Sequence, residues 1–432
     1  MTRPRLHFTA ETGWINDPHG ITYHQGAYHV FFQYVPDQVV WGVHCHWGHA
    51  TGADLLSLTQ QPAALAPGDG DAGIWSGSLT TTEDGRAVIL YTTASGLDAS
   101  AHARIRRATP ADDNWSTWVK GPVVVDAPDD IALTGFRDPF IRRERDHWRM
   151  FVGAGDTSGT AMALSYTSPD LESWAYDGIA LQRTTSETTP VWMGTLWECP
   201  QIFELDGHAV MVSSVWENNT LHYAGYALGA YVDGSFTAAT WGQLTYGDSH
   251  YAPSYFTDDD GRPCLLFWMR GIEDPAAGWA GALSIPYVLS VVESRLVATP
   301  HPDLEQYRGI LRPHHTVGTG CADITWQQTN GELIIETEAA RLLTLHRDGD
   351  TLTAITVGGT VTFPVDGELR IIVDGPVVEI SSRAGLFGTH IPAAAEFQVI
   401  ATDRATLSLY ELSSAVEPSQ VDGAQLRSEA DR

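Results

Sequence analysis

The stretch ITYHQGAYHVFFQY, residues 21–34, decides the fold of this protein. A polar turn that ends at Gly26 joins a short strand to a strongly apolar one, which is typical of a β-hairpin. The same pattern returns four times, with turns that end at Gly85, Asp146, Gly207 and Gly261. From Gly26 the steps are 59, 61, 61 and 54 residues. A hairpin that recurs at this spacing indicates a repeated β unit.

Five such units, each with room for four strands, predict a five-bladed β-propeller over residues 1–300. Helical repeats fit poorly, because the apolar runs are β-branched and are interrupted by Gly and Asp. Beyond residue 300, short alternating strands with Gly-rich turns predict an antiparallel β-sandwich over residues 301–416. Residues 417–432 are polar and contain no aromatic residue, so we expect a disordered tail. The expected fold class is therefore all-β, a five-bladed β-propeller followed by a C-terminal antiparallel β-sandwich.

The charge balance restricts the partners of the chain. The sequence has 25 basic and 53 acidic residues, a net charge of −28, which repels phosphate backbones and anionic headgroups. We therefore expect neither nucleic acid nor membrane as a partner. We find no signal peptide or membrane span, and Cys45, Cys199, Cys264 and Cys321 lie far apart without a CxxC pair, which favours a cytoplasmic location. The oligomeric state stays open.

The five turns also give a common register for candidate functional residues. Asp17, Ser76, Asp138, Glu198 and Ala252 each stand eight or nine residues before the end of a turn. The first strand of each propeller blade lines the axis, so equivalent positions form a ring at one mouth, and three carboxylates are expected to meet there. Such a group suits glycoside hydrolysis, in which one carboxylate attacks or activates water and one acid protonates the leaving oxygen. Asp-Pro pairs are also common in turns, but three motifs in one register favour a site.

Other candidates fit less well. Glu217 also follows a Trp, but it lies at the far end of the second strand of its unit. His44 and His46 share a face of a strand, whereas His49 points the other way, so we expect no metal. Cys199 has no His partner in register and is expected to be a small packing residue. The Gly-rich runs PGDGDAG and VGTGCAD lack a strand–helix setting, so no cofactor is expected.

Four motifs carry a family resemblance: GWINDPHG (13–20), IWSGS (74–78), FRDP (136–139) and WECP (197–200). They resemble, in order, the signatures of glycoside hydrolase family 32, which contains invertases, sucrose-6-phosphate hydrolases, levanases and inulinases. The resemblance runs from Trp14 to about Gly385, and the family's fold is a five-bladed propeller with a C-terminal β-sandwich. It implies a retaining β-fructofuranosidase that hydrolyses terminal β-D-fructofuranosyl linkages of sucrose or short fructo-oligosaccharides through a covalent fructosyl-enzyme.

The resemblance also implies roles for single residues. Asp17 matches the nucleophile, Glu198 the acid/base, and Asp138 the residue that holds fructose hydroxyls and steadies the transition state. The charge of Asp17 is expected to raise the pKa of Glu198, and Arg137 is expected to neutralise Asp138. The residues that match the fructose subsite are Trp14, Asn16, Gln33, Trp41, Trp75, Ser76, Arg137, Tyr251 and Trp268.

The chain departs from the family pattern in several places. His19 stands where Asn is usual, the segment Trp41–Trp47 looks one residue longer, and Leu58 replaces a common Trp. These changes leave the leaving group open, so a sucrose-6-phosphate hydrolase and a fructan (inulin or levan) exohydrolase are alternatives. Arabinose-releasing glycosidases of a related fold also use three carboxylates but invert. An inactive fructan-binding protein on the same fold is a remote alternative, since all three carboxylates are present.

Overall fold

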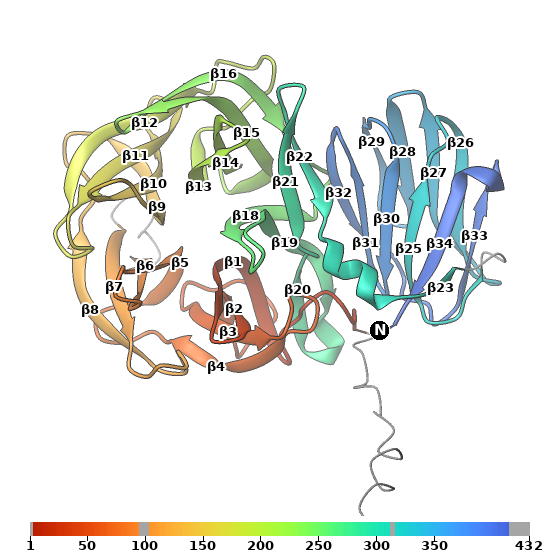
Figure 1. Ribbon diagram of the computed structural model, residues 1–432, viewed down its shortest axis with the longest axis horizontal. Helices are drawn as coiled ribbons and strands as arrows, with labels where there is room; N and C mark the ends of the chain where they lie inside the picture. Colours follow the sequence, from red (N-terminus) through yellow and green to blue (C-terminus); the bar gives the residue numbers. More distant parts are fainter. Residues whose placement is uncertain (1–2, 95–102, 312–315, 414–432) are drawn as a thin grey trace, which may run out of the picture.

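The computed structural model describes residues 3–94, 103–311 and 316–413, and all of their long elements are β-strands (Figure 1). The all-β class is therefore confirmed. The helices within these ranges are three short 3-10 turns, η1 (Pro275–Ala277), η2 (Pro302–Tyr307) and η3 (Arg404–Thr406). None of them is long or apolar enough to cross a membrane. The predicted tail, 417–432, lies outside the described residues.

Three of the five predicted units form separate four-stranded antiparallel sheets. Their strands follow one another in the chain, so each sheet is a meander. The second unit contains β5 (Gly73–Thr81), β6 (Ala87–Ala94), β7 (Arg104–Pro110) and β8 (Trp118–Val125). The third contains β9 (Leu133–Arg143), β10 (Trp148–Asp156), β11 (Thr160–Ser168) and β12 (Ala175–Thr184). The fourth contains β13 (Leu196–Leu205), β14 (His208–Glu217), β15 (Thr220–Val232) and β16 (Ser235–Gln243).

The first and fifth units are joined in a single nine-stranded sheet, which the repeat did not predict. Strand β20 runs parallel to β1, with Trp14 opposite Ala280. Gly281 permits this approach: its φ is +84°, and a Cβ there would lie 2.0 Å from the carbonyl oxygen of Ile15. The strands are β1 (Gly13–His24), β2 (Ala27–Val35), β3 (His46–Gly52), β4 (Thr59–Leu65), β18 (His250–Thr257), β19 (Pro263–Asp274), β20 (Trp279–Leu283), β21 (Tyr287–Val292) and β22 (Arg295–Pro300).

All five predicted hairpins are present, and two of their turns show why glycine stands in them. Gln25 and Gly26 have φ of 50° and 86°, and Asp206 and Gly207 have φ of 50° and 78°. Two successive residues with positive φ match the twist of the flanking strands in a two-residue hairpin loop. The repeated Gly is thus a backbone requirement.

The first strands of the five units lie innermost (Figure 1). Strands β1, β5, β9, β13 and β18 contact one another in that cyclic order, and β18 contacts β1 again. Residues far apart in the sequence therefore meet wherever these five strands are in register.

The chain beyond β22 forms two sheets, one of which also takes in β17 from the N-terminal part, and the two share one apolar cluster that includes Trp326, Leu343, Ile371 and Phe397. The first sheet contains β17 (Thr245–Tyr246), β32 (Gly385–His390), β31 (Val377–Ser382), β30 (Leu369–Asp374), β25 (Cys321–Trp326), β34 (Leu407–Leu412) and β23 (Arg308–Leu311). The second contains β24 (Thr316–Val317), β33 (Phe397–Ala401), β26 (Asn330–Glu336), β27 (Arg341–Asp348), β28 (Thr351–Thr356) and β29 (Gly359–Pro364).

A buried charged cluster joins this C-terminal part to the N-terminal part. His7 lies between two carboxylates, with Nδ1 2.9 Å from Asp374 Oδ2 and Nε2 2.7 Å from Glu379 Oε1. Asp374 also accepts the backbone N–H groups of Arg5, Leu6 and His7. Burial opposes the charge on His7, but the two carboxylates outweigh it and raise the pKa of His7 to about 9. The imidazole therefore holds both protons at neutral pH and donates to both acids.

We predict that His7→Gln destabilises the protein by about 3 kcal/mol near pH 6, because it leaves buried carboxylates without their cation. The folded-state pKa of His7 is raised, so its contribution is complete below about pH 6.5 and is lost as the pH rises through about 9. The gap between wild type and variant in urea unfolding should therefore shrink at alkaline pH. His346→Gln, at an exposed histidine, is the control. A gap that stays constant from pH 6 to pH 10 would contradict the assignment.

Candidate active site

The five inner strands share one irregularity, a β-bulge at the same height. The residues immediately before it are paired regularly: Asn16 with Gln33, Trp75 with Thr92, Arg137 with Gly153, Glu198 with Ser214 and Tyr251 with Trp268. The extra residue that follows is Asp17, Ser76, Asp138, Cys199 or Ala252. Proline follows in four of the five strands. Proline cannot donate to a ladder and is tolerated at bulges, so NDP, RDP, ECP and YAP are bulge sequences.

The register counted from the turns is wrong by one residue in β13. Glu198 occupies the paired position before the bulge, and Cys199 is the bulge residue. The backbone agrees, since Asp138, Cys199 and Ala252 have φ of 65°, 50° and 48°. The number of residues between the bulge and the following turn differs by one between units. Counting back from the turn therefore cannot locate the bulge residue in every unit.

The structure brings Asp17 and Asp138 within reach of the Cys199 thiol. The thiol sulfur lies 3.9 Å from Asp17 Oδ2 and 3.7 Å from Asp138 Oδ2. The backbone N–H of Cys199 donates to Asp138 Oδ2 at 3.0 Å. Burial and the surrounding acids raise the pKa of Cys199 far above its usual range, so it stays a neutral thiol. Cys199 thus offers donors to the two carboxylates, a role that sequence reasoning missed.

Asp17 is surrounded by donors. Asn16 Nδ2 donates to Asp17 Oδ1 at 3.0 Å, and Ser76 Oγ donates to Oδ2 at 2.7 Å. Gln33 Nε2 reaches Oδ2 at 3.3 Å, and Trp14 Nε1 in turn orients Asn16 by donating to its Oδ1 at 3.1 Å. The carboxylate is therefore held in one orientation by side chains from three strands.

Glu198 has a different environment. Arg137 Nη1 donates to Glu198 Oε1 at 2.8 Å, and the Tyr251 hydroxyl donates to Oε2 at 2.7 Å. Burial raises the pKa of Glu198, and the charge of Asp17 raises it further, while Arg137 and Tyr251 act in the opposite direction. Burial, and not Asp17 as expected, is the larger cause. Arg137 pairs with Glu198, although its charge also lowers the pKa of Asp138.

Asp138 completes the group. Burial raises its pKa to about 7, and the charges of Glu198 and Asp17 add to the effect. The backbone N–H of Asp138 donates to Thr92 Oγ1 at 2.7 Å, which fixes the bulge against β6. At neutral pH a carboxyl of this kind can donate a hydrogen bond as well as accept one.

Aromatic rings wall the three carboxylates. The ring centroids of Trp14 and Trp268 are 5.5 Å apart, and Trp75 lies 6.0 Å from Trp41, which is 47% exposed at the rim. Trp268 Nε1 and Gln33 Oε1 are buried without a hydrogen-bond partner in the described part of the chain. A ligand that carries hydroxyl groups would satisfy them. The structure therefore groups eight of the nine predicted lining residues with the carboxylates, and Trp41 lies at the rim against Trp75.

Arg270 belongs to the same wall, although the sequence analysis did not select it. Its guanidinium lies 4.7 Å from the ring centroid of Tyr251, and its charge lowers the pKa of Glu198. Its Nη1 and Nη2 donate to the carbonyls of Leu221 and His222 at 2.7 and 3.0 Å. The signal was present in WMR, because a residue two positions after Trp268 on a strand faces the same side.

The departures from the family pattern differ in their distance from the site. His19 is buried against Trp47, with ring centroids 4.0 Å apart, and burial lowers its pKa to about 3, so it is neutral. It lines a small cavity of about 50 Å³ beside Asp138 and Cys199. Leu58 packs at the edge of an apolar cluster that the first and fifth units share. Of the three departures, the Trp41 segment is the one whose exposed side chain can meet a bound ligand.

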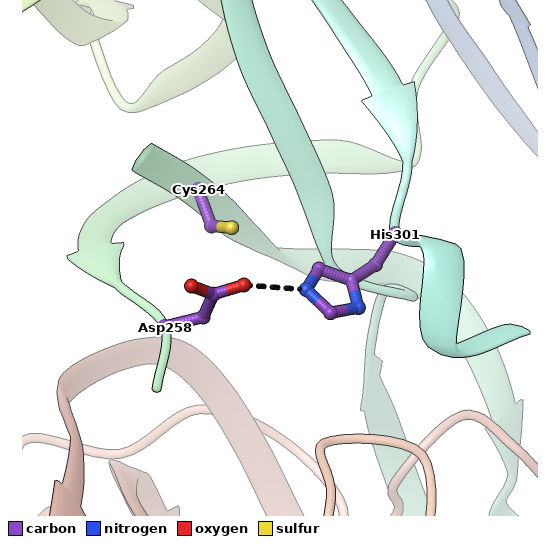
Figure 2. A group of neighbouring side chains, drawn as sticks. All are labelled: Asp258, Cys264 and His301. Carbon is purple, nitrogen blue, oxygen red and sulfur yellow. Dashed lines mark hydrogen bonds and ion pairs between the residues drawn. The ribbon is translucent and has the colours of Figure 1, made fainter. Parts of the chain in front are cut away.

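One group of three potential metal ligands occurs in the described ranges, Asp258, Cys264 and His301 (Figure 2). Its members already have hydrogen-bond partners, and the Cys264 thiol donates to the carbonyl of Arg262. His301 Nε2 lies 2.9 Å from Asp258 Oδ2, while His301 Nδ1 accepts the N–H of Asp303 at 3.2 Å. Arg262 Nε donates to the same Asp258 oxygen at 2.5 Å. Because a guanidinium already neutralises this carboxylate, the cluster is suited to join η2 to the β18–β19 hairpin and not to hold a cation.

The histidines weighed as a metal site do not form such a group. His44 is at the surface, with Nε2 3.1 Å from Asp37 Oδ1. His49 stacks on Phe31 in the interior, with ring centroids 4.5 Å apart. The two side chains therefore point apart.

Residues 7–300 match the Glycosyl hydrolases family 32 N-terminal domain, which covers more than half of the chain and all of the bulge motifs. The chain belongs to glycoside hydrolase family 32. Among the relatives of this family 32 chain is a sucrose-6-phosphate hydrolase of Zymomonas mobilis, 32% identical over 71% of this chain and 63% of that protein. A raffinose invertase of Escherichia coli is 31% identical over 72% of this chain and 67% of the relative. The chain thus spans somewhat less than two thirds of the first relative's length.

Solved structures show the same fold for the family 32 chain. A Bombyx mori family 32 β-fructofuranosidase superposes with a TM-score of 0.82 at 24% identity, covering 95% of this chain and 94% of the other. A fructan 1-exohydrolase of Cichorium intybus gives a TM-score of 0.79 at 20% identity, covering 96% and 98%. The similarity extends through the C-terminal part, beyond the residues that the family match covers.

Proposed function

We propose that this protein is a retaining β-fructofuranosidase that releases fructose from sucrose or short fructo-oligosaccharides. One observation carries the proposal: Asp17, Glu198 and Asp138 lie together but have different partners. The aromatic rings of Trp14, Trp75 and Trp268 surround them, and this site is called the cup below. Asp17 is oriented by neutral donors, whereas Glu198 is buried beside an arginine and has a raised pKa. Two carboxyl groups in different environments are what acid-assisted displacement at a sugar carbon needs.

In this mechanism Asp17 attacks the anomeric carbon of the fructosyl unit while the bond to the leaving oxygen breaks. Glu198 gives its proton to that oxygen. Water then attacks the fructosyl ester, Glu198 takes a proton from the water, and Asp17 is released as a carboxylate. Asp138 holds sugar hydroxyls, for which a carboxyl that can donate and accept is suited.

We further propose that residues 1–300 form a five-bladed β-propeller and residues 301–416 a β-sandwich. The cyclic contacts of β1, β5, β9, β13 and β18 support the first part, and the apolar cluster shared by the two C-terminal sheets supports the second. The parallel β20–β1 pair then closes the ring between the last blade and the first. A crystal structure with the inner strands in another cyclic order would contradict this architecture.

The leaving group is proposed to be uncharged. Relatives include sucrose-6-phosphate hydrolases, a raffinose invertase, a fructan 6-exohydrolase of Beta vulgaris and a levanase of Bacillus subtilis, so names alone do not select a substrate. The two arginines beside Glu198 already have partners, Arg137 in Glu198 itself and Arg270 in two backbone carbonyls. A phosphate on the leaving sugar would have to compete with these partners for either guanidinium.

We therefore expect kcat/KM for sucrose to exceed that for sucrose-6-phosphate by about tenfold or more, the effect of roughly one lost charge contact. The measurement is fructose release from sucrose, sucrose-6-phosphate, inulin and levan under the same conditions. A preference for the phosphorylated sugar would replace the invertase assignment with a sucrose-6-phosphate hydrolase.

Asp17→Asn and Glu198→Gln should each lower kcat by about 10³-fold or more with the fold intact, because each removes one of the two reacting groups. Glu217→Gln is the matched control, a nearby glutamate outside the bulge, and should keep near-normal activity. Fructose release and near-ultraviolet circular dichroism are measured on each purified variant. Near-normal turnover in either of the first two would remove that residue from the mechanism.

Stereochemistry tests the role of Asp17 directly. Attack by Asp17 followed by attack by water inverts the anomeric carbon twice, so fructose should appear first as the β-furanose in early-time NMR. Retention requires the two carboxyl groups to be about 5–5.5 Å apart, whereas inversion needs about 6.5–9.5 Å. The α anomer as first product would make Asp17 a general base and favour the inverting, arabinosidase-like mechanism.

A further inference from the structure

The start of strand β18 connects the C-terminal part of the protein to Glu198. Consecutive side chains on a strand point to opposite faces. His250 faces the C-terminal sheet, where its Nε2 lies 2.5 Å from Glu379 Oε2. The next residue, Tyr251, faces the cup and donates its hydroxyl to Glu198 Oε2 at 2.7 Å. Two adjacent residues therefore link a carboxylate of β31 to the proposed acid.

Glu379 is built to be immobile. It is 1% exposed, and each of its oxygens has two partners. His7 Nε2 and the backbone N–H of Ile285 meet Oε1 at 2.7 and 2.9 Å. His250 Nε2 and the Tyr287 hydroxyl meet Oε2 at 2.5 and 2.7 Å. A buried carboxylate with its acceptor sites filled cannot change direction without leaving donors unpaired.

The His250 ring is equally confined. A Cβ on Gly388, in the neighbouring strand β32, would lie 2.8 Å from the ring, so the imidazole and that backbone are already in close contact. Phe267 and Tyr287 flank the ring, with centroids 5.3 and 6.2 Å away. Because the ring cannot shift, the backbone of His250 is held, and with it the direction of Tyr251.

We propose that Glu379 and His250 are positioning residues for the acid/base: the C-terminal part holds β18 from behind so that the Tyr251 hydroxyl meets Glu198. The inference rests on the proposed function only in naming Glu198 as the acid. Nothing in the reaction itself requires a second domain, and the proposed nucleophile and acid both come from the N-terminal part. The C-terminal part is thereby a component of the catalytic apparatus.

The consequence is a change in the titration of Glu198. The charged and titratable groups that face it are Arg137, Tyr251, Asp17 and Arg270, together with Asp138, whose own pKa the charge of Glu198 raises. The Tyr251 hydrogen bond lowers the pKa of Glu198, so its loss should raise that pKa. The reaction needs Glu198 protonated, and kcat/KM should therefore stay high to a more alkaline pH when Tyr251 no longer reaches Glu198.

The experiment compares the pH profiles of kcat/KM on sucrose for Tyr251→Phe, His250→Gln and Glu379→Gln. The alkaline limb of the kcat/KM profile should move to higher pH by about one unit in all three variants. This is the usual size of a pKa shift caused by one lost hydrogen bond. His7→Gln is the matched control, because it removes a partner of the other oxygen of Glu379 and does not touch β18. It should lower stability and leave the limb in place. An equal shift in His7→Gln would show that general loosening of the junction moves the limb, and would overturn the proposal.

A double variant separates positioning from an independent effect. If His250 acts through Tyr251, adding His250→Gln to Tyr251→Phe should move the limb no further. An additive shift would overturn the proposal, and the same test holds if Glu379→Gln does not fold.

A structural readout does not depend on the reaction. In a crystal structure of His250→Gln the distance from the Tyr251 hydroxyl to Glu198 Oε2 should exceed 3.5 Å, against 2.7 Å in the wild type. An unchanged distance would overturn the positioning role. If wild type fails to release fructose from every sugar tested, the proposed function fails, and this distance still decides the inference.

Discussion

The β-bulge in each inner strand is the constraint on which the rest of the structure depends. A regular strand would alternate its side chains and could not present adjacent residues to one cup. The bulge inserts one residue, and in β9 and β13 it is built with a positive φ at Asp138 and Cys199. The prolines that follow cannot donate to a ladder, so they suit the one place where pairing is interrupted.

Three acids can share one buried site because each is stabilised by a different set of neighbouring groups. Asp17 has neutral donors, Glu198 has Arg137 and Tyr251, and Asp138 has the amide and thiol of Cys199. Burial disfavours the charged form of the last two and raises both pKa values. The same desolvation that makes the group costly for folding also keeps a proton available where an acid is needed.

The N-terminal and C-terminal parts of the chain are connected by charged groups as well as by apolar contacts. His7, from the N-terminal segment, is held between Asp374 and Glu379 of the C-terminal sheet, and His250 reaches Glu379 from β18. A fully buried cluster of this kind penalises separation of the halves, because each group would lose its partner. This charged cluster contacts β18, the strand that carries Tyr251. The contact between the two parts of the chain and the active site therefore share β18.

The sequence alone was enough to predict the all-β class, the five hairpins and the family, because these depend on local patterns. It also named three carboxylates that the structure brings into one group. Gly in the turns, apolar strands after them and the NDP, RDP and ECP motifs are all visible within a few residues. Only the tertiary structure decided the parallel β20–β1 pair, the one-residue difference that makes Cys199 the bulge residue, the pairing of Arg137 with Glu198, and the recruitment of Arg270 and Glu379. Each of these depends on how segments far apart in the chain meet, which no local periodicity reports. Sequence patterns report what a segment prefers, whereas the partner it meets is decided when the chain closes on itself.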